Sequence, residues 1–251
     1  MSSLREFPHS ISVIIPTYNE VKRLPATLPA VYEYLTNNVR DFEILVVDDG
    51  SSDSTAAWAR SFSATHAGIK VLPNKENRGK GAVAQQGLAA ARGEYRLYLD
   101  ADHSTNIREL AQLPRLVPTG AEVFIGSRYV AGSQIAIKQP WQRVLVSRIA
   151  NALIRLLAVP GIHDTQNGFK IFSARAARAV LPYLHLRGWA FDIELLFVAR
   201  RLGFKLYEFP ITWKNDFGSK LSIARDIKKT GCEFAIFLFN RLRRRYPKKS
   251  R

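Results

Sequence analysis

The sequence predicts an α/β fold in which a mostly parallel sheet carries helices on both faces. Short apolar runs alternate with helical segments through the first half of the chain. These runs are apolar almost throughout, as strands are when helices cover both faces of a parallel sheet. Clusters of polar residues follow several of the runs directly. Together, these three observations predict a doubly covered sheet with a ligand site at one edge.

Five strand signals in the first half are separated by helix signals. The run ISVIIP opens the series, and EILVV follows a helical stretch, LPATLPAVYEYL. Ser51, Ser52 and Asp53 are favourable N-cap residues for the helix after the second strand. In chain order, strands are predicted over 11–16, 43–47, 69–72, 95–99 and 121–126, and helices over 24–35, after 51–53 and over 77–93.

The second half predicts longer amphipathic helices and two further strands. Residues 141–159 have apolar side chains at helical spacing, with arginines on the polar face. The helix predicted over 191–203 ends at a glycine. Strands are predicted over 168–172 and 205–213.

The charge of the chain implies an anionic partner. Its 251 residues include 37 Lys+Arg and 21 Asp+Glu, a formal net charge of +16. Nucleic acid, anionic lipid and a phosphorylated substrate are the candidate partners. One cysteine excludes an intrachain disulfide. The N-terminus has no apolar core of a secretory signal, and FAIFLF is far shorter than the roughly 20 residues of a membrane span.

The tail over 221–246 is predicted to be a cationic amphipathic helix. Such a helix is typical of a membrane interface, with Phe234, Phe237 and Leu238 as the inserted side chains. The alternative is a helix that packs on the domain and exposes a basic face. The expected organisation is an α/β catalytic domain over 1–220 and a basic amphipathic tail over 221–251.

Four polar clusters follow the predicted strands. They are PTYNE at 16–20, DDGSSD at 48–53, DADHS at 100–104 and GSRY at 126–129. Because the carboxyl ends of parallel strands share one edge of a sheet, these clusters predict a binding site there.

Asp100 and Asp102 are the candidate metal ligands. Two carboxylates around one residue can hold Mg²⁺ or Mn²⁺ that is shared with substrate phosphates. The alternative is a pair of solvated loop acids, and the position after a buried strand favours the metal. Asp48 and Asp49 can accept hydrogen bonds from a ribose or base, or cap the next helix. The stretch NRGKG is either a phosphate cradle at a helix N-terminus or the start of a capped surface helix.

The motifs PTYNE, VDDGSSD, NRGKGAV, DAD, GSRY and DTQNGFK, in this order, resemble the inverting family 2 glycosyltransferases of the GT-A fold. The resemblance covers roughly residues 10–222. It is closest to the polyprenyl-phosphate hexose synthases, with dolichyl-phosphate β-glucosyltransferases first and dolichyl-phosphate mannose synthases next.

The resemblance implies a role for each matching residue. Asp100 and Asp102 would hold the metal on the donor diphosphate, and the mannose synthases' next amide position is Ser104 here. The implied donor residues are Pro16, Tyr18, Glu20, Asp48, Asp49, Lys80, Asp164 and Gln166. The implied residues for an acceptor phosphate are Arg128, Arg143, Ser147, Ser219 and Lys220.

A lipid phosphate is itself a nucleophile, because its second pKa near ~6 leaves it largely dianionic at neutral pH. The site therefore needs cations, and arginines suit phosphate; the alternative for each is a solvated surface charge. Asp192 and Glu194 lie where related transferases keep a catalytic base, or are acids favourable to a helix N-terminus.

The leading hypothesis is transfer of a hexose, with glucose favoured, from UDP-glucose or GDP-mannose to a polyprenyl (dolichyl) phosphate. The enzyme would attach peripherally to the cytoplasmic face of a membrane. A family 2 enzyme with a soluble or glycan acceptor is the second hypothesis. No recognised nucleic-acid motif is present, so a nucleic-acid partner is not expected.

Overall fold

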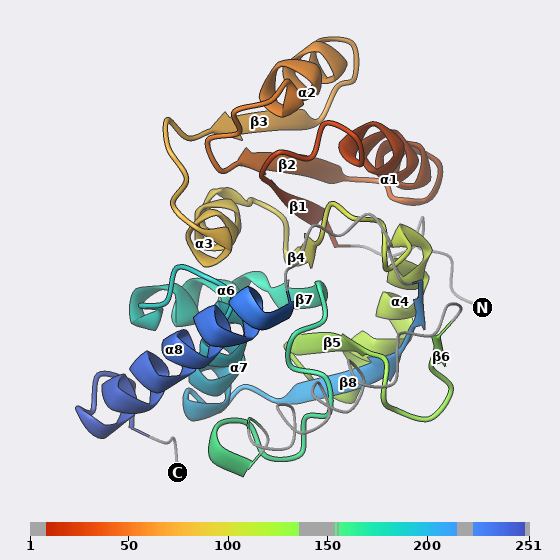
Figure 1. Cartoon of the computed structure of the whole chain (residues 1–251). Coiled ribbons are helices and arrows are strands. Elements are labelled where there is room, and N and C mark those ends of the chain that lie inside the picture. Colours follow the sequence, from red (N-terminus) through yellow and green to blue (C-terminus); the bar gives the residue numbers. More distant parts are fainter. Residues whose placement is uncertain (1–8, 136–153, 155, 215–222, 249–251) are drawn as a thin grey trace.

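A computed structural model describes residues 9–135, 154, 156–214 and 223–248, with only the backbone of 223–230. A seven-stranded sheet with strand order β3-β2-β1-β4-β7-β5-β8 forms its centre (Figure 1). The strands are β1 (Ile11–Thr17), β2 (Phe42–Asp48), β3 (Ile69–Pro73), β4 (Tyr95–Leu99), β5 (Val123–Ser127), β7 (Phe169–Ser173) and β8 (Leu206–Pro210). A second, two-stranded sheet pairs β6 (Gln134–Ile135) with β9 (Thr212–Trp213).

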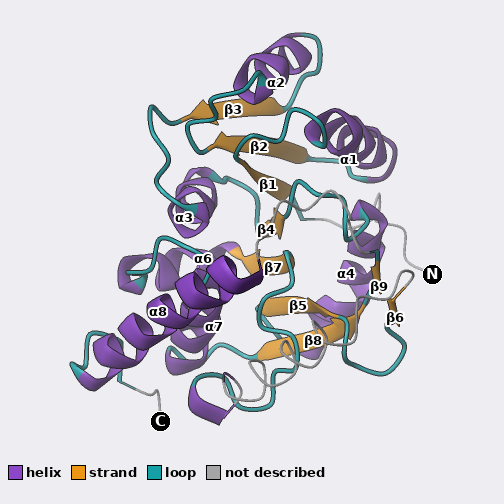
Figure 2. Cartoon of the chain, viewed as in Figure 1, coloured by secondary structure: helices purple, strands orange, loops and turns teal. Residues whose placement is uncertain are grey.

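Helices pack on both faces of the sheet, as Figure 2 shows. They are α1 (Leu24–Asn38), α2 (Thr55–Ala64), α3 (Lys80–Ala90), α4 (Leu113–Leu116), α6 (Ala174–Val180), α7 (Phe191–Arg201) and α8 (Ile223–Leu242). Short 3-10 turns are η2 (Ile107–Gln112), η3 (Val117–Thr119) and η4 (Leu181–Tyr183). The predicted α/β fold is confirmed.

Most predicted strands match the structure to within two residues. The exception is 205–213, which is not one strand. It divides at Ile211 into β8 of the large sheet and β9 of the small one. Most of the helix predicted over 141–159, and the predicted domain boundary at 220, lie outside the described residues.

One strand of the large sheet runs against the others. β7 is antiparallel to both β4 and β5, whereas the other pairs are parallel. Its register pairs Leu99 with Phe169. The amino end of β7 therefore lies at the carboxyl end of β4, and the segment before β7 reaches the edge where the polar clusters lie.

Alternate side chains of the strands build two cores. On β1, Ile14 belongs to the core shared with α3, α6, α7 and α8. Val13 and Ile15 belong to the core shared with α1, α2 and α4. Burial of β1 on both faces explains why its sequence is apolar except at Ser12 and Thr17.

The C-terminal part of α8 packs on α7. The Phe237 ring is fully buried and meets Phe197 edge to face, with the ring centroids 5.0 Å apart. Beyond the helix, the buried Tyr246 donates a hydrogen bond of 2.6 Å to Glu194. Phe234 and Leu238 pack partly buried against the same core.

The prediction that Phe234, Phe237 and Leu238 insert into a membrane is therefore wrong. Phe237 packs on Phe197 of α7, and Phe234 and Leu238 pack against the same core. Within the described residues, no helix is long and apolar enough to cross a membrane.

Tyr246→Phe tests the attachment of this C-terminal segment. Burial raises the pKa of Glu194, and the Tyr246 hydroxyl opposes burial by stabilising the ionised carboxylate. Removing the hydroxyl should lower the free energy of unfolding by about 2 kcal/mol at neutral pH. The loss should shrink as the pH falls towards 4 and Glu194 takes up its proton. Urea unfolding across this pH range measures it, and a loss that is equal at both ends would contradict the pairing.

Candidate active site

The site lies where the strand order changes direction. From β1, the sheet continues through β2 and β3 on one side and through β4 on the other. The order of the strands along the chain therefore reverses between β1 and β4. In open α/β sheets, ligands bind beyond the carboxyl ends of the strands at such a point. Asp100 follows β4 directly, and its amide donates to the carbonyl of Gly168, just before β7.

Asp100 is held in an ion pair with Lys80. The Lys80 Nζ lies 2.9 Å from Asp100 Oδ1, and the Tyr98 hydroxyl donates to the same oxygen over 3.1 Å. The Lys80 ammonium also lies 4.7 Å from the ring centroid of Trp189 and 5.7 Å from that of Tyr98. Two aromatic faces and one carboxylate thus fix this cation at the first turn of α3.

The two candidate metal ligands have opposite electrostatic surroundings. Burial alone would raise the pKa of Asp100, but the attraction and hydrogen bond of Lys80 outweigh it and lower that pKa. Burial and the neighbouring Asp100 charge raise the pKa of Asp102. Two carboxylates that repel each other are a place where a divalent cation relieves unfavourable charge.

The donor set fits a divalent cation that also binds substrate oxygens. Two hydrogen bonds fix the loop over residues 100–104. Thr27 donates to the carbonyl of Ala101 over 2.8 Å, and the Ser104 amide donates to Asp102 over 2.9 Å. The described residues contain no group of three or more His, Cys, Asp or Glu that could hold a metal. Asp100 and Asp102 would therefore supply two ligands, and substrate or water the others.

A second ion pair lies behind the first. Lys170 on β7 is buried and donates over 2.7 Å to Asp192, in the first turn of α7. It also donates to the carbonyl of Asn167. Burial raises the pKa of Asp192 in spite of this partner. Glu194 instead accepts hydrogen bonds from the amides of His185 and Leu186, as well as from Tyr246.

The first two polar clusters are joined by Asn19. Its side-chain oxygen accepts from the amide of Ser52 over 2.9 Å, and its own amide donates to Ser51 Oγ over 2.9 Å. Its φ of 55° is left-handed, a conformation that asparagine tolerates better than most residues. Beside it, Tyr18 is exposed, Pro16 is buried in β1, and Glu20 pairs with Arg23.

Asp48 and Asp49 both hold loops. Asp48 accepts a hydrogen bond from the amide of Ser51, in the loop before α2. It does not cap that helix, whose N-cap residue is Ser54, so the capping alternative is wrong. Asp49 accepts from the amides of Arg78 and Gly79 over 2.6 and 3.0 Å. Asp49 therefore fixes the NRGKG loop against the end of β2, and Asp48 fixes the loop that follows β2.

The N-terminus of α3 already has an acceptor. The carbonyl of Arg187 accepts from the amides of Gly81 and Ala82 over 2.7 and 3.2 Å. These two amides therefore do not form the phosphate cradle that NRGKG suggested. Nor is α3 a surface helix, because its residues Gly81–Ala84 are buried.

Arg128, which is partly buried, forms a bidentate pair with the buried Asp164. Arg128 donates through Nε and Nη2 to the two carboxylate oxygens, each over 2.8 Å, and through its amide over 2.9 Å. Its guanidinium carbon lies 5.2 Å from the ring centroid of Trp213. Burial opposes the charge on Arg128, but Asp164 outweighs burial and raises the pKa of Arg128. Nη1 has no hydrogen-bond partner among the described residues.

The segment DTQNG contains buried polar groups without partners. Thr165 Oγ1 and Asn167 Nδ2 are buried and make no hydrogen bond with the described residues. Gln166, between them, is half-buried. Unpaired buried donors next to Asp100 are the groups that a polar ligand satisfies. Arg143, Ser147, Ser219 and Lys220, the other predicted acceptor residues, lie outside the described residues.

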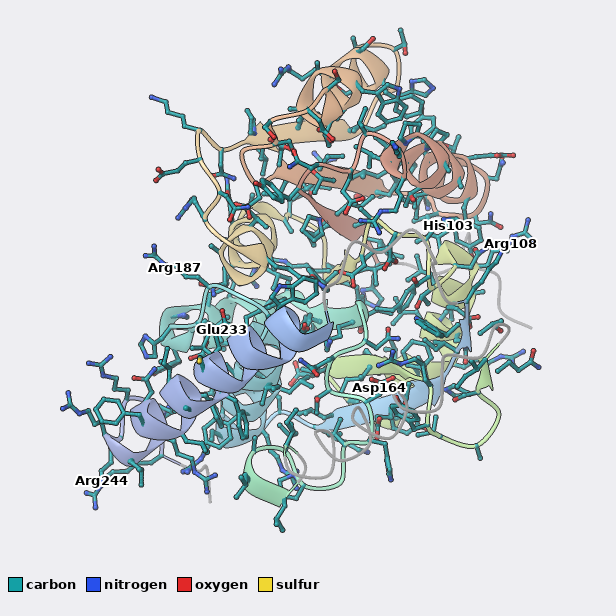
Figure 3. All side chains as sticks on the ribbon, viewed as in Figure 1. His103, Arg108, Asp164, Arg187, Glu233 and Arg244 are labelled. Atoms are coloured by element: carbon teal, nitrogen blue, oxygen red, sulfur yellow. The ribbon has the colours of Figure 1, made fainter. Side chains whose placement is uncertain are left out.

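Trp189, Lys170 and Glu233 also belong to the site, although the sequence did not single them out. Glu233 lies on α8 (Figure 3). It accepts a hydrogen bond of 2.8 Å from the amide of Ala190, the residue after Trp189. For Lys170, the sequence did contain a signal. A lysine in the middle of the apolar strand GFKIF is expected to be buried, and a buried lysine requires an acidic partner. Trp189 and Glu233 gave no signal, since their contacts join distant segments.

The comparisons agree with this geometry. Residues 12–181 match the model of glycosyl transferase family 2. The chain belongs to this family and is a glycosyltransferase. It is 34% identical over 223 residues to the dolichyl-phosphate β-glucosyltransferase of Dictyostelium discoideum, covering 84% of this chain and 68% of the relative. It is 33% identical over 224 residues to that of Homo sapiens, covering 84% and 69%.

Solved structures share the GT-A fold. Glucosyl-3-phosphoglycerate synthase from Mycobacterium tuberculosis, in complex with Mn²⁺, UDP and phosphoglyceric acid, has a TM-score of 0.69 at 18% identity. The match covers 96% of this chain and 83% of that one. A mannosyltransferase from Pyrobaculum calidifontis, in complex with GDP-Man and Mn²⁺, has a TM-score of 0.60 at 20% identity, covering 91% and 63%.

Gly168→Ala tests whether the segment before β7 positions Asp100. A Cβ at this position would overlap the Asp100 carboxylate, so that side chain must move. We expect kcat to fall on the order of a hundredfold, with the fold retained by circular dichroism. Gly231→Ala on α8 is the control, because a Cβ there meets nothing within 4 Å. Wild-type turnover by the Gly168 variant would contradict this role.

Proposed function

We propose that this glycosyltransferase moves a hexose, with glucose favoured, from a nucleotide sugar to a polyprenyl (dolichyl) phosphate. The observation that carries the proposal is the ion pair of Lys80 and Asp100 beside Asp102, at the point where the strand order reverses. The printed names of the Dictyostelium and human relatives support glucose and dolichyl phosphate as the substrates.

The chemistry is an inverting substitution at the anomeric carbon of the sugar. An oxygen of the acceptor phosphate forms the new bond to this carbon, and the bond to the nucleoside diphosphate breaks. Because the attacking phosphate is already ionised, no proton has to be removed. The residues must therefore orient two anionic substrates and stabilise the charge that collects on the leaving diphosphate.

Asp100 and Asp102 would hold Mg²⁺ or Mn²⁺. The cation, when bound, neutralises the diphosphate and makes it a better leaving group. Lys80 adds a fixed positive charge beside it, and Asp100 and the rings of Trp189 and Tyr98 hold that charge in place. We propose that Pro16, Tyr18, Glu20, Asp48 and Asp49 form the nucleoside side of the donor site.

Arg128 with Asp164 would form the sugar and acceptor side of the site. Nε and Nη2 of Arg128 are used by Asp164, so the acceptor phosphate would meet Nη1. Gln166 and the unpaired Thr165 and Asn167 would contact sugar hydroxyls. Asp192 was the candidate for a catalytic base, but an ionised phosphate needs none. We propose instead that its pair with Lys170 fixes the charges behind Lys80.

A transfer assay with two donors tests the reaction. Radiolabelled UDP-glucose and GDP-mannose are each offered with a polyprenyl phosphate, with and without EDTA, and organic extraction recovers the product. We expect label from UDP-glucose in the organic phase, and its loss with EDTA. Label from GDP-mannose alone would identify a mannose synthase instead.

Asp102→Asn tests the metal ligands in the same assay. We expect at least a hundredfold lower kcat/KM and a weaker response to added Mn²⁺, because the amide cannot replace a charged ligand. Asp41→Asn, at an exposed acid before β2, is the matched control. An Asp102 variant with full metal-dependent transfer would exclude this assignment.

Arg128→Lys distinguishes a lipid phosphate acceptor from a neutral soluble one. The lysine keeps the charge but cannot reproduce the bidentate bond to Asp164 that leaves Nη1 directed at a phosphate. We expect the KM for the acceptor phosphate to rise about tenfold while the KM for the donor changes little. Arg108→Lys, at an exposed arginine, is the control. An unchanged acceptor KM would favour the soluble or glycan acceptor.

We further propose that the reaction takes place at the cytoplasmic face of a membrane, to which the protein attaches peripherally. The basis is the acceptor, whose polyprenyl chain lies in the bilayer while its phosphate lies at the surface.

A further inference from the structure

We infer that the outer face of α8 and the residues that follow it bind the surface of an anionic membrane. This inference rests on the proposed function, because it names the surface through which the enzyme would reach a lipid acceptor. The outer face is defined by Ile236, Phe239 and Leu242, with the basic residues Arg243, Arg244, Arg245 and Lys248.

The apolar part of the outer face is a stripe along one side of the helix. Ile236, Phe239 and Leu242 follow each other at intervals of three residues and are 51, 50 and 81% exposed. Phe237 and Asn240 on the opposite side are buried. Large apolar side chains gathered in this way on a surface mark a contact.

The charge of the outer face complements an anionic surface. No acidic residue occurs after Glu233 in the sequence. Among the described residues, none of the arginines from 241 to 245 forms an ion pair with an acid, and all are exposed. Arg243 lies over the ring of Phe239, with its guanidinium carbon 4.3 Å from the ring centroid. Cations directly beside exposed apolar side chains match the boundary between headgroups and acyl chains.

A bilayer fits this combination better than the other occupants. Nucleic acid would use the cations and leave the apolar stripe in water. A second copy of the chain would cover the stripe but bring two arginine clusters together. Anionic lipid satisfies both parts at once.

The opposite side of α8 connects this surface to the active site. Glu233 accepts from the Ala190 amide, and the adjoining Trp189 lies over Lys80. One helix therefore presents the membrane surface on one side and supports the loop beside Lys80 and Asp100 on the other. A membrane-bound α8 would hold the active site next to the phosphates of its lipid acceptors.

Vesicle sedimentation without donor or polyprenyl phosphate tests the surface independently of catalysis. Vesicles of phosphatidylcholine alone are compared with vesicles that also contain phosphatidylglycerol. We expect binding to the anionic vesicles that weakens as salt is added. Failure of the wild-type protein to bind them would overturn the inference.

Two variants separate the apolar and the charged contributions. The triple variant Ile236→Ser, Phe239→Ser, Leu242→Ser should weaken vesicle binding at least a hundredfold. Arg243→Gln with Lys248→Gln should weaken it on the order of 20-fold, and only on anionic vesicles. The matched controls are Tyr207→Ser, an exposed apolar residue on β8, and Arg60→Gln with Arg115→Gln on other helices. Variants that bind like wild type, or controls that lose binding equally, would overturn the inference.

Two further measurements guard against misreading. Thermal melting checks that the triple variant folds. Sedimentation equilibrium detects whether the wild-type protein forms a dimer. If the serine substitutions dissociate such a dimer and leave vesicle binding unchanged, the surface binds a second copy of the chain instead. A probe on Cys232, the only cysteine of the chain and exposed one turn before Ile236, should report an apolar environment with anionic vesicles.

The transferase activity is measured separately with a short-chain, water-soluble isoprenyl phosphate and no vesicles. The surface variants should keep wild-type kcat and KM in this assay. Vesicle binding without any transfer by the wild-type protein would leave the membrane surface standing and reject the proposed function. Transfer without vesicle binding would support the proposed function and reject the membrane surface.

Discussion

The ion pair between Lys80 and Asp100 is the interaction on which the arrangement of the site depends. It joins the first turn of α3 to the end of β4, across the point where the strand order reverses. A partly buried ion pair needs the support of further contacts, because the desolvation of its charges is costly. Here Tyr98 donates to the carboxylate and Trp189 covers the ammonium. The second pair, Lys170 with Asp192, continues this alternation of charges into the core.

The antiparallel strand β7 is the feature of the fold that completes the site. A parallel strand in its place would put the segment DTQNG at the opposite edge of the sheet. Its reversed direction instead brings Gly168 against Asp100, and Asp164 against Arg128 after β5. The proposed donor side and the proposed acceptor side thus meet at β4 and β7. Gly168 is a glycine here because no side chain fits between the strand and the Asp100 carboxylate.

α8 serves the site from outside the sheet. Its buried side is part of the core, through Phe237, and its Glu233 supports the loop that bears Trp189. Its other side is apolar and basic. Packing on α7 decides that Phe237 is buried and Phe239 exposed. Helical periodicity alone did not predict this, because aromatic residues surround most of the helix.

The sequence by itself determined the α/β class, the strands of the first half and the edge at which Asp49, Asp100 and Arg128 gather, because apolar periodicity and polar strand ends are local signals. Only the tertiary structure decided which partners these residues have. The pairing of Arg128 with Asp164, the capping of α3 by the Arg187 carbonyl and the contact of Trp189 with Lys80 all join segments far apart in the chain. Such contacts depend on strand direction and helix packing, and short motifs carry no information about either.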